Sequence, residues 1–110
     1  MLAEEPTLDL VFQALADPTR RFIVDRLTHG PATVSQLARP FKMSLPAVHQ
    51  HLRVLETSGL VRSEKIGRVR TCHVETRVLR SAEQWIIQRR TVWEKRLDRL
   101  GEYLANQEPS

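Results

Sequence analysis

Residues 43–61 read MSLPAVHQHLRVLETSGLV, and this stretch has the pattern of a helix that packs on a core through one side only. At about 100° per residue, its apolar side chains fall within one stripe at the i, i+3/i+4, i+7 spacing of an amphipathic helix. The predicted core-facing residues are Leu45, Val48, Leu52 and Leu55. Ser44 stands where an N-cap would, and Gly59 stands where a residue with positive φ ends many helices.

The opposite side of this helix is short, polar or basic, and it carries Pro46, Ala47, Gln50 and Arg53. A compact helix with such a face can enter the major groove of DNA. Chemically, Gln50 suits adenine, Arg53 suits guanine and Ala47 suits the methyl group of thymine. Taken alone, the stretch fits an ordinary surface helix of an all-α domain equally well.

Two helices are predicted upstream. The first covers residues 8–16, with Leu8, Val11, Phe12 and Leu15 on one face. Asp17-Pro18 separates it from the second, because proline lacks a backbone N–H and suits the first position of a helix. This second helix covers residues 18–28, and Phe22, Ile23 and Leu27 are expected to point inward. His29-Gly30-Pro31 ends it.

A short helix is predicted directly before the central one. Thr33 and Gln36 have the spacing of a capping box, and the helix that they open extends to about residue 40. Residues 41–43 then form the turn into the central helix. Two short helices joined by such a turn make a helix-turn-helix.

A hairpin is predicted after Gly59. Residues 60–66 and 69–74 are rich in strand-forming side chains and flank the turn signal Gly67-Arg68. Its basic residues are Arg62, Lys65, Arg68 and Arg70. This density of positive charge lies beside the helix that could enter a DNA groove, and it favours contact with phosphates. The alternative is an ordinary hairpin whose charges are only hydrated.

Residues 76–106 predict one long helix, with Gly101 as a point where it could fray. Its apolar seam has heptad-like spacing and consists of Ala82, Ile86, Trp93, Leu97, Leu100 and Leu104. A domain of this size cannot cover such a helix on all sides, so we expect the first and last helices to build a homodimer. The expected interface residues are Leu8, Val11, Phe12, Trp85, Ile86, Trp93, Leu97 and Leu100. Packing within the chain is the alternative.

The composition fits one globular domain with a basic balance. The chain has 110 residues, a net charge of +4 and one cysteine, Cys72. No transmembrane run or signal peptide is recognisable, so we expect a cytoplasmic protein with no membrane partner. The positive charge favours nucleic acid as a partner, here double-stranded DNA. Within the single domain, residues 7–75 form the core unit, residues 76–106 the dimerisation helix and residues 107–110 a tail.

Neither catalysis nor metal binding is indicated. There is no glycine-rich phosphate loop, no zinc-protease motif and no plausible triad, so we expect no enzyme activity, no cofactor and no metal. His49 and His51 are two apart on a helix and diverge, and Cys72 and His73 alternate across a strand, so neither pair chelates one ion. Cys72 could act as a thiol sensor if its pKa were lowered, with Arg70 nearby to help.

Several ordered motifs resemble the ArsR-type bacterial repressors. They are residues 12–21, FQALADPTRR, residues 35–38, SQLA, and residues 44–61, SLPAVHQHLRVLETSGLV. The resemblance covers residues 8–75 well, whereas the last helix matches only in kind. It implies a winged helix-turn-helix of order α-α-α-α-β-β-α, mainly helical with one small β-hairpin, the wing.

The resemblance also implies function. It indicates a homodimeric transcriptional repressor that binds an inverted-repeat operator, and its own promoter is one candidate site. Such a repressor would act on the nucleoid in a bacterial cytoplasm. By position, Ser44, Pro46, Ala47, Gln50 and Arg53 would face the groove, and the basic wing residues would lie by phosphates. His51 lies at the flank of the buried stripe, where it would read a base, contact a phosphate or serve the fold.

The usual metal ligands of the family are missing. Metal-sensing members carry a cysteine pair on the third helix, where this chain reads VSQLAR at residues 34–39. Others use aspartate and histidine on the last helix, and residues 76–106 contain no histidine. We therefore expect the non-metal-sensing branch, with an unidentified small-molecule inducer as one open possibility.

Two other hypotheses stay open. A winged helix can bind protein instead of DNA, because fold alone does not fix function. Such a wing should expose large apolar residues, and none is evident from the sequence. The other hypothesis is a repressor gated by a ligand or by a thiol, with the tryptophan-rich last helix shaping a pocket at the dimer interface.

Overall fold

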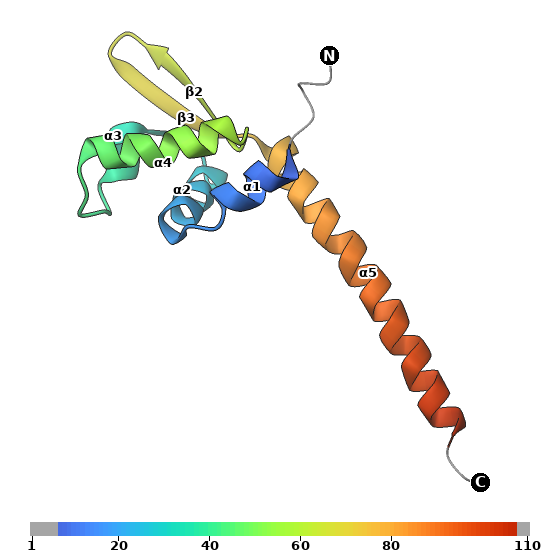
Figure 1. The fold of residues 1–110 in the computed structure, drawn as a ribbon. Helices are drawn as coiled ribbons and strands as arrows, with labels where there is room; N and C mark the ends of the chain where they lie inside the picture. The colour runs from blue at the N-terminus through green and yellow to red at the C-terminus, as the bar shows by residue number, and fades with distance from the viewer. Residues whose placement is uncertain (1–6, 108–110) are drawn as a thin grey trace.

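The computed structural model describes residues 7–107, and these form a winged helix-turn-helix with a projecting C-terminal helix (Figure 1). The helices and strands follow one another as α1 (Leu8–Ala14), α2 (Pro18–Thr28), β1 (Ala32–Thr33), α3 (Val34–Ala38), α4 (Leu45–Thr57), β2 (Val61–Ile66), β3 (Val69–Val74) and α5 (Thr76–Asn106). The predicted mainly helical architecture with one small antiparallel hairpin is confirmed. Of the predicted tail at residues 107–110, residues 108–110 lie outside the described residues.

The three strands make one antiparallel sheet in the order β1-β3-β2. β2 and β3 form the wing, and Gly67 supplies the positive φ of +63° that the turn between them requires. β1 pairs with the base of β3, placing Ala32 opposite Cys72. β1 was not predicted, because a two-residue strand leaves no alternation in the sequence to detect.

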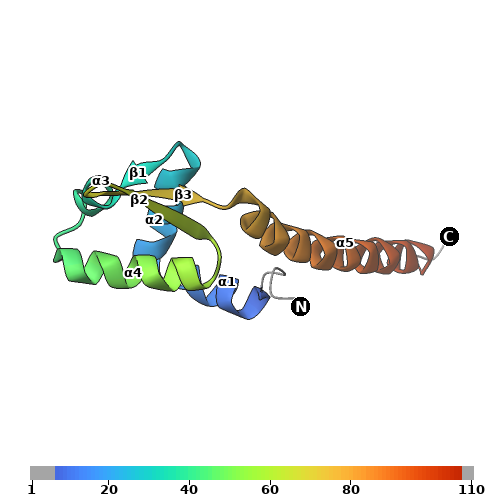
Figure 2. The ribbon, with the colours of Figure 1, turned by 90° about the horizontal axis from the view of Figure 1, so that it is seen from above.

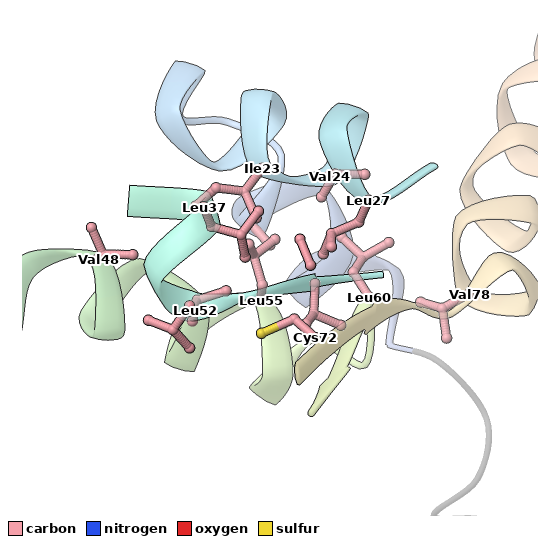
Figure 3. Packing of buried hydrophobic residues seen from close by; sticks show 14 of the residues in the cluster. Ile23, Val24, Leu27, Leu37, Val48, Leu52, Leu55, Leu60, Cys72 and Val78 are labelled. Atoms are coloured by element: carbon pink, nitrogen blue, oxygen red, sulfur yellow. The ribbon is translucent and has the colours of Figure 1, made fainter. Parts of the chain in front are cut away.

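One hydrophobic core joins α1, α2, α3, α4, the base of the wing and the start of α5 (Figure 3). Val48, Leu52 and Leu55 on α4 are at most 2% exposed. Each such side chain contributes about 1.5–3 kcal/mol when it is removed from water. This burial fixes the rotation of α4 about its axis, and so decides which of its residues point outward.

Local signals at the helix ends are confirmed. Ser44 Oγ accepts from the backbone N–H of Ala47, and Thr33 and Gln36 form the complete capping box. Gly59 follows the end of α4 with a φ of +85°, as expected of a C′ glycine. The helix boundaries were therefore predictable to within about two residues from these local signals.

Two core predictions are wrong. Leu45 is 51% exposed, because it is the first residue of α4 and lies beyond the point where the core ends. Phe22 is 48% exposed and packs edge-on against Phe41, with ring centroids 5.2 Å apart. Val24, two residues further along α2, is buried instead.

Gly101 does not interrupt α5, which stays helical through that position.

Helix α5 begins against the body of the protein and then projects away from it (Figures 1 and 2). Only Val78 and Ala82 of its residues are buried in the shared core. The described chain therefore measures 76 × 39 × 21 Å, far from spherical. Nowhere in residues 7–107 is there a helix both long and apolar enough to cross a membrane.

Asp17 provides a test of the capping chemistry. Its carboxylate accepts from the backbone N–H of Arg20 at 3.0 Å, and this bond, with smaller contributions from the charges of His51 and Arg20, lowers its pKa. We expect Asp17→Ala to lower the free energy of unfolding by about 1 kcal/mol, and Asp17→Asn, which keeps an acceptor, to lower it less.

The two variants also separate charge from capping. Because the pKa of Asp17 is lower in the folded state, its charge stabilises the fold above its unfolded pKa, and this contribution is lost as pH falls through its folded pKa. Denaturant titrations from neutral to acidic pH should show that loss in the native chain and not in Asp17→Asn. Equal acid sensitivity in both would contradict this assignment.

Candidate nucleic-acid interface

The outward face of α4 is a polar ridge. The exposed residues along it are Pro46, His49, Gln50, Arg53 and Thr57, with Ser44 at its N-terminus and Ala47 half-buried beside it. Hollows lie on both sides, one of about 450 Å³ against α1 and one of about 220 Å³ against the wing, and Arg53 lines both. A helix that stands out between two hollows has the shape needed to enter a groove.

His49 also belongs to this ridge, although it was not among the predicted groove-facing residues. It is exposed and lines the hollow on the wing side together with Arg53. The signal was present in the sequence, because residues 46, 49, 50 and 53 follow the same i, i+3, i+4, i+7 spacing as the buried stripe. A neutral histidine can both donate and accept, so it suits base edges and phosphates alike.

His51 has a structural position instead. Its Nδ1 atom accepts from Arg20 Nη1 at 3.3 Å and lies 3.8 Å from Asp17 Oδ2. Arg20 also donates through Nε to the carbonyl oxygen of Ala14 at 2.8 Å. His51 therefore ties α4 to the junction of α1 and α2, and we remove it from the groove-facing residues.

The pairing register divides the wing into two faces. Lys65 and Arg70 are cross-strand partners and share a face with Ser63 and Cys72, the pair directly below them. Cys72 is fully buried in the core, so this is the face that turns toward α4. The predicted basic wing residues Lys65 and Arg70 therefore lie on the same side as the recognition ridge.

Arg62 lies on the other face, opposite His73. Its Nε atom donates to Glu75 Oε1 at 2.8 Å, and Glu64 lies 4.0 Å from its guanidinium group. Because residues of opposite parity along a strand point to opposite faces, the predicted basic residue Arg62 does not share the face of Lys65 and Arg70. Arg68 is exposed in the turn at the tip, beyond both faces.

The wing also exposes two large apolar side chains, contrary to expectation. Ile66 is 73% exposed and Val69 is 50% exposed, and they pair across the strands next to the turn. Their register places them on the face that carries Arg62, away from Lys65 and Arg70.

Cys72 is unsuited to thiol sensing. It is fully buried, and burial together with the negative charge of Glu56 raises its pKa to about 11, despite the opposing effect of Arg70. Because the thiolate is the reactive form, a thiol with a raised pKa and no solvent access is inert. Arg70 does lower the pKa, as the sequence suggested, but desolvation by the surrounding core has the larger effect and depends on the fold.

Most of the apolar surface of α5 is not covered by other elements of the described chain. Its exposed large apolar residues are Trp85, Ile86, Val92, Trp93, Leu97, Leu100, Tyr103 and Leu104, five of which were predicted for the interface. On α1, Leu8 and Phe12 are partly exposed, whereas Val11 is fully buried in the core and is therefore wrongly placed in that interface. Phe12 meets Trp85 edge-on at 5.7 Å.

A cleft of about 550 Å³ lies between α1 and α5. Its lining is mostly apolar and includes Phe12, Leu15, Leu79 and Ile86, with Arg80 and Arg90 among its polar residues. This is the place where the sequence analysis expected a partner helix or a pocket. Among residues 7–107, no three histidine, cysteine, aspartate or glutamate side chains gather in a way that could hold a metal ion.

Comparisons with known proteins agree with this geometry. A helix-turn-helix domain family matches residues 15–64. The transcriptional repressor SdpR of Bacillus subtilis is 32% identical over 77 residues, which cover 70% of this chain and 86% of that protein. The HTH-type transcriptional regulator Rv2034 of Mycobacterium tuberculosis is 56% identical over 59 residues, but the match spans only 54% of this chain and 55% of that regulator.

Solved structures give the same result. The crystal structure of the ArsR family transcriptional regulator RHA00566 superimposes with a TM-score of 0.75 and is 50% identical. The alignment covers 79% of this chain and 96% of that one.

The buried state of Cys72 can be tested by alkylation. With a pKa of about 11 and no exposure, Cys72 should react with iodoacetamide at least tenfold more slowly in the native protein than in guanidinium chloride at the same mildly alkaline pH. Mass spectrometry of quenched samples measures the rate. Native labelling as fast as that of the unfolded chain would show that the thiol is accessible.

Proposed function

Because the chain belongs to the ArsR-type family of winged helix-turn-helix transcriptional regulators, which bind DNA and are not enzymes, we propose that it represses transcription as a homodimer on an inverted-repeat operator. In this proposal α4 enters the major groove, the basic face of the wing contacts phosphates, and α1 and α5 join two copies. Its own promoter and neighbouring genes are the first candidate sites.

One observation carries the proposal: the ridge of α4 has no acidic side chain. From Pro46 to Thr57 its exposed positions are neutral or basic, and Glu56 is turned aside toward the wing. A carboxylate on that ridge would be repelled by the phosphates that line both edges of the groove. Gln50 and Arg53 supply the amide and guanidinium groups that pair with adenine and guanine.

The wing adds affinity rather than sequence preference. Lys65, Arg68 and Arg70 are exposed, and a cation placed against a phosphate releases a condensed counterion from the DNA. Each such contact strengthens binding to all sequences and makes it weaker at higher salt. The protein would work on the bacterial nucleoid, in the cytoplasm.

The proposed dimer rests on the uncovered apolar face of α5. Eight large apolar side chains stay exposed along a helix that the rest of the described chain does not cover. A second copy related by a two-fold axis would cover both helices at once and would present two α4 ridges. The two ridges would then meet half-sites about 10 base pairs apart, which predicts an imperfect inverted repeat.

A second candidate function is binding of a protein by the wing. The exposed pair Ile66 and Val69 favours it, because these apolar side chains stand on the face without Lys65 and Arg70. Recovery of a stoichiometric protein partner by a chain that binds no duplex DNA would replace the first proposal with this one.

Mobility shifts on the DNA upstream of its own gene test the repressor proposal. Gln50→Ala should lower the preference for that DNA over a scrambled duplex by about tenfold, since one bidentate base contact gives about 1–3 kcal/mol of discrimination. Arg68→Ala should weaken binding to both duplexes about equally. Gln84→Ala, an exposed glutamine on α5, is the matched control. Specific binding that survives Gln50→Ala unchanged would contradict the placement of α4.

Sedimentation velocity tests the dimer. Leu97→Glu places a charge in the apolar seam of α5 and should shift the native dimer toward monomer by at least tenfold in dissociation constant. Thr91→Glu adds the same charge at an exposed site on the opposite side of the helix and should leave assembly unchanged. Equal dissociation in both variants would argue against a seam-specific interface.

A further inference from the structure

The crease between α4 and the wing is lined from both elements. His49, Leu52, Arg53 and Glu56 come from α4, and Arg70 comes from β3, around a hollow of about 220 Å³. The one apolar member, Leu52, is 2% exposed and closes the bottom. The accessible wall is therefore polar and carries two guanidinium groups.

A chain of hydrogen bonds fixes one of these groups. Arg70 Nη1 donates to Ser63 Oγ at 3.0 Å, and Ser63 Oγ in turn donates to the Glu56 carboxylate. Glu56 Oε1 also lies 4.0 Å from Arg70 Nη1. The relay runs from the wing to α4, so it sets both the direction of Arg70 and the spacing between the two elements.

The relay uses little of the binding capacity of Arg70. A guanidinium group has five N–H donors, and the hydroxyl of Ser63 takes one of them. The planar group held in this way can present a preformed pair of donors to an anion. Glu56 does not cancel the site, because the two positive charges of Arg53 and Arg70 outweigh its single negative charge.

The geometry of DNA indicates which part of the duplex would enter this crease. The major and minor grooves are separated by a single sugar-phosphate strand. When a helix lies in the major groove and a hairpin beside it reaches toward the adjacent minor groove, that strand has to pass between them. The crease is the space between α4 and the wing, and it is lined with phosphate-binding groups.

On the basis of the proposed function, we infer that the crease is a phosphodiester-binding subsite. Arg70 holds one backbone phosphate, and His49 and Arg53 lie beside it on the same wall. Glu56 and Ser63 are positioning residues, which act through Arg70 and do not touch the DNA. The relay thereby lets the recognition helix and the wing hold the strand as one rigid clamp.

Salt titrations of DNA binding test the phosphate contact. The probe is a duplex of mixed sequence, and fluorescence anisotropy gives the affinity at a series of salt concentrations. Each phosphate contact contributes about 0.9 to the slope of log affinity against log salt, so Arg70→Ala should reduce the slope by about 1.8 in a dimer. Arg62→Ala removes the same charge from the other face of the wing and should leave the slope unchanged.

Ser63 variants test the positioning role. Ser63→Ala alters no charge, and loss of one hydrogen bond should weaken DNA binding by roughly 2- to 10-fold. Ser63→Thr keeps the hydroxyl and should restore the affinity. In an Arg70→Ala background, Ser63→Ala should have no further effect, because its action passes through Arg70. If Ser63 had only a structural role, Ser63→Ala would weaken DNA binding equally in the native chain and in the Arg70→Ala variant.

The outcomes separate this inference from the function on which it rests. Equal salt slopes in Arg70→Ala and Arg62→Ala, with the native chain still binding DNA, overturn the phosphate subsite alone. Additive effects of Ser63→Ala and Arg70→Ala overturn the relay alone. A native chain that binds no duplex at any salt concentration overturns the repressor proposal together with this inference. Unchanged circular dichroism in each variant shows that the fold is intact.

Discussion

The burial of Val48, Leu52 and Leu55 is the constraint on which the rest of the structure depends. These three side chains lock α4 on the core, so His49, Gln50 and Arg53 point outward. The same packing places the end of α4 against the base of β2, where Glu56 meets Ser63. Orientation of the ridge and placement of the wing are therefore two results of one packing arrangement.

The predictable part of the fold was encoded locally. The capping box at Thr33, the N-cap at Ser44 and the glycines at 59 and 67 act within a few residues, so their signals can be identified without any tertiary contact. Burial is different, because it depends on where the core ends. Leu45 and Phe22 match the apolar pattern yet lie past that edge, and β1 exists only because β3 offers it a partner.

The candidate site shows the same division. The ridge residues followed from helical periodicity, and His49 was missed although it obeys that periodicity. His51, Arg62 and Cys72 could not be assigned from the sequence, because their partners lie elsewhere in the chain. Arg20 comes from another helix, Glu75 comes from the far end of the hairpin, and the core that surrounds Cys72 comes from several elements. Side chains of the right chemistry were identified, but their directions required the fold.

The length of α5 has a consequence for dosage. Its 31 residues span about 46 Å at 1.5 Å per residue, and most of its large apolar side chains are exposed in the single chain. In the proposed dimer, the DNA-binding form is built from two molecules. At concentrations below the dimer dissociation constant, its amount rises with the square of the amount of protein. Halving the cellular supply then lowers the active form about fourfold, so abundance itself acts as a steep control on the genes it represses.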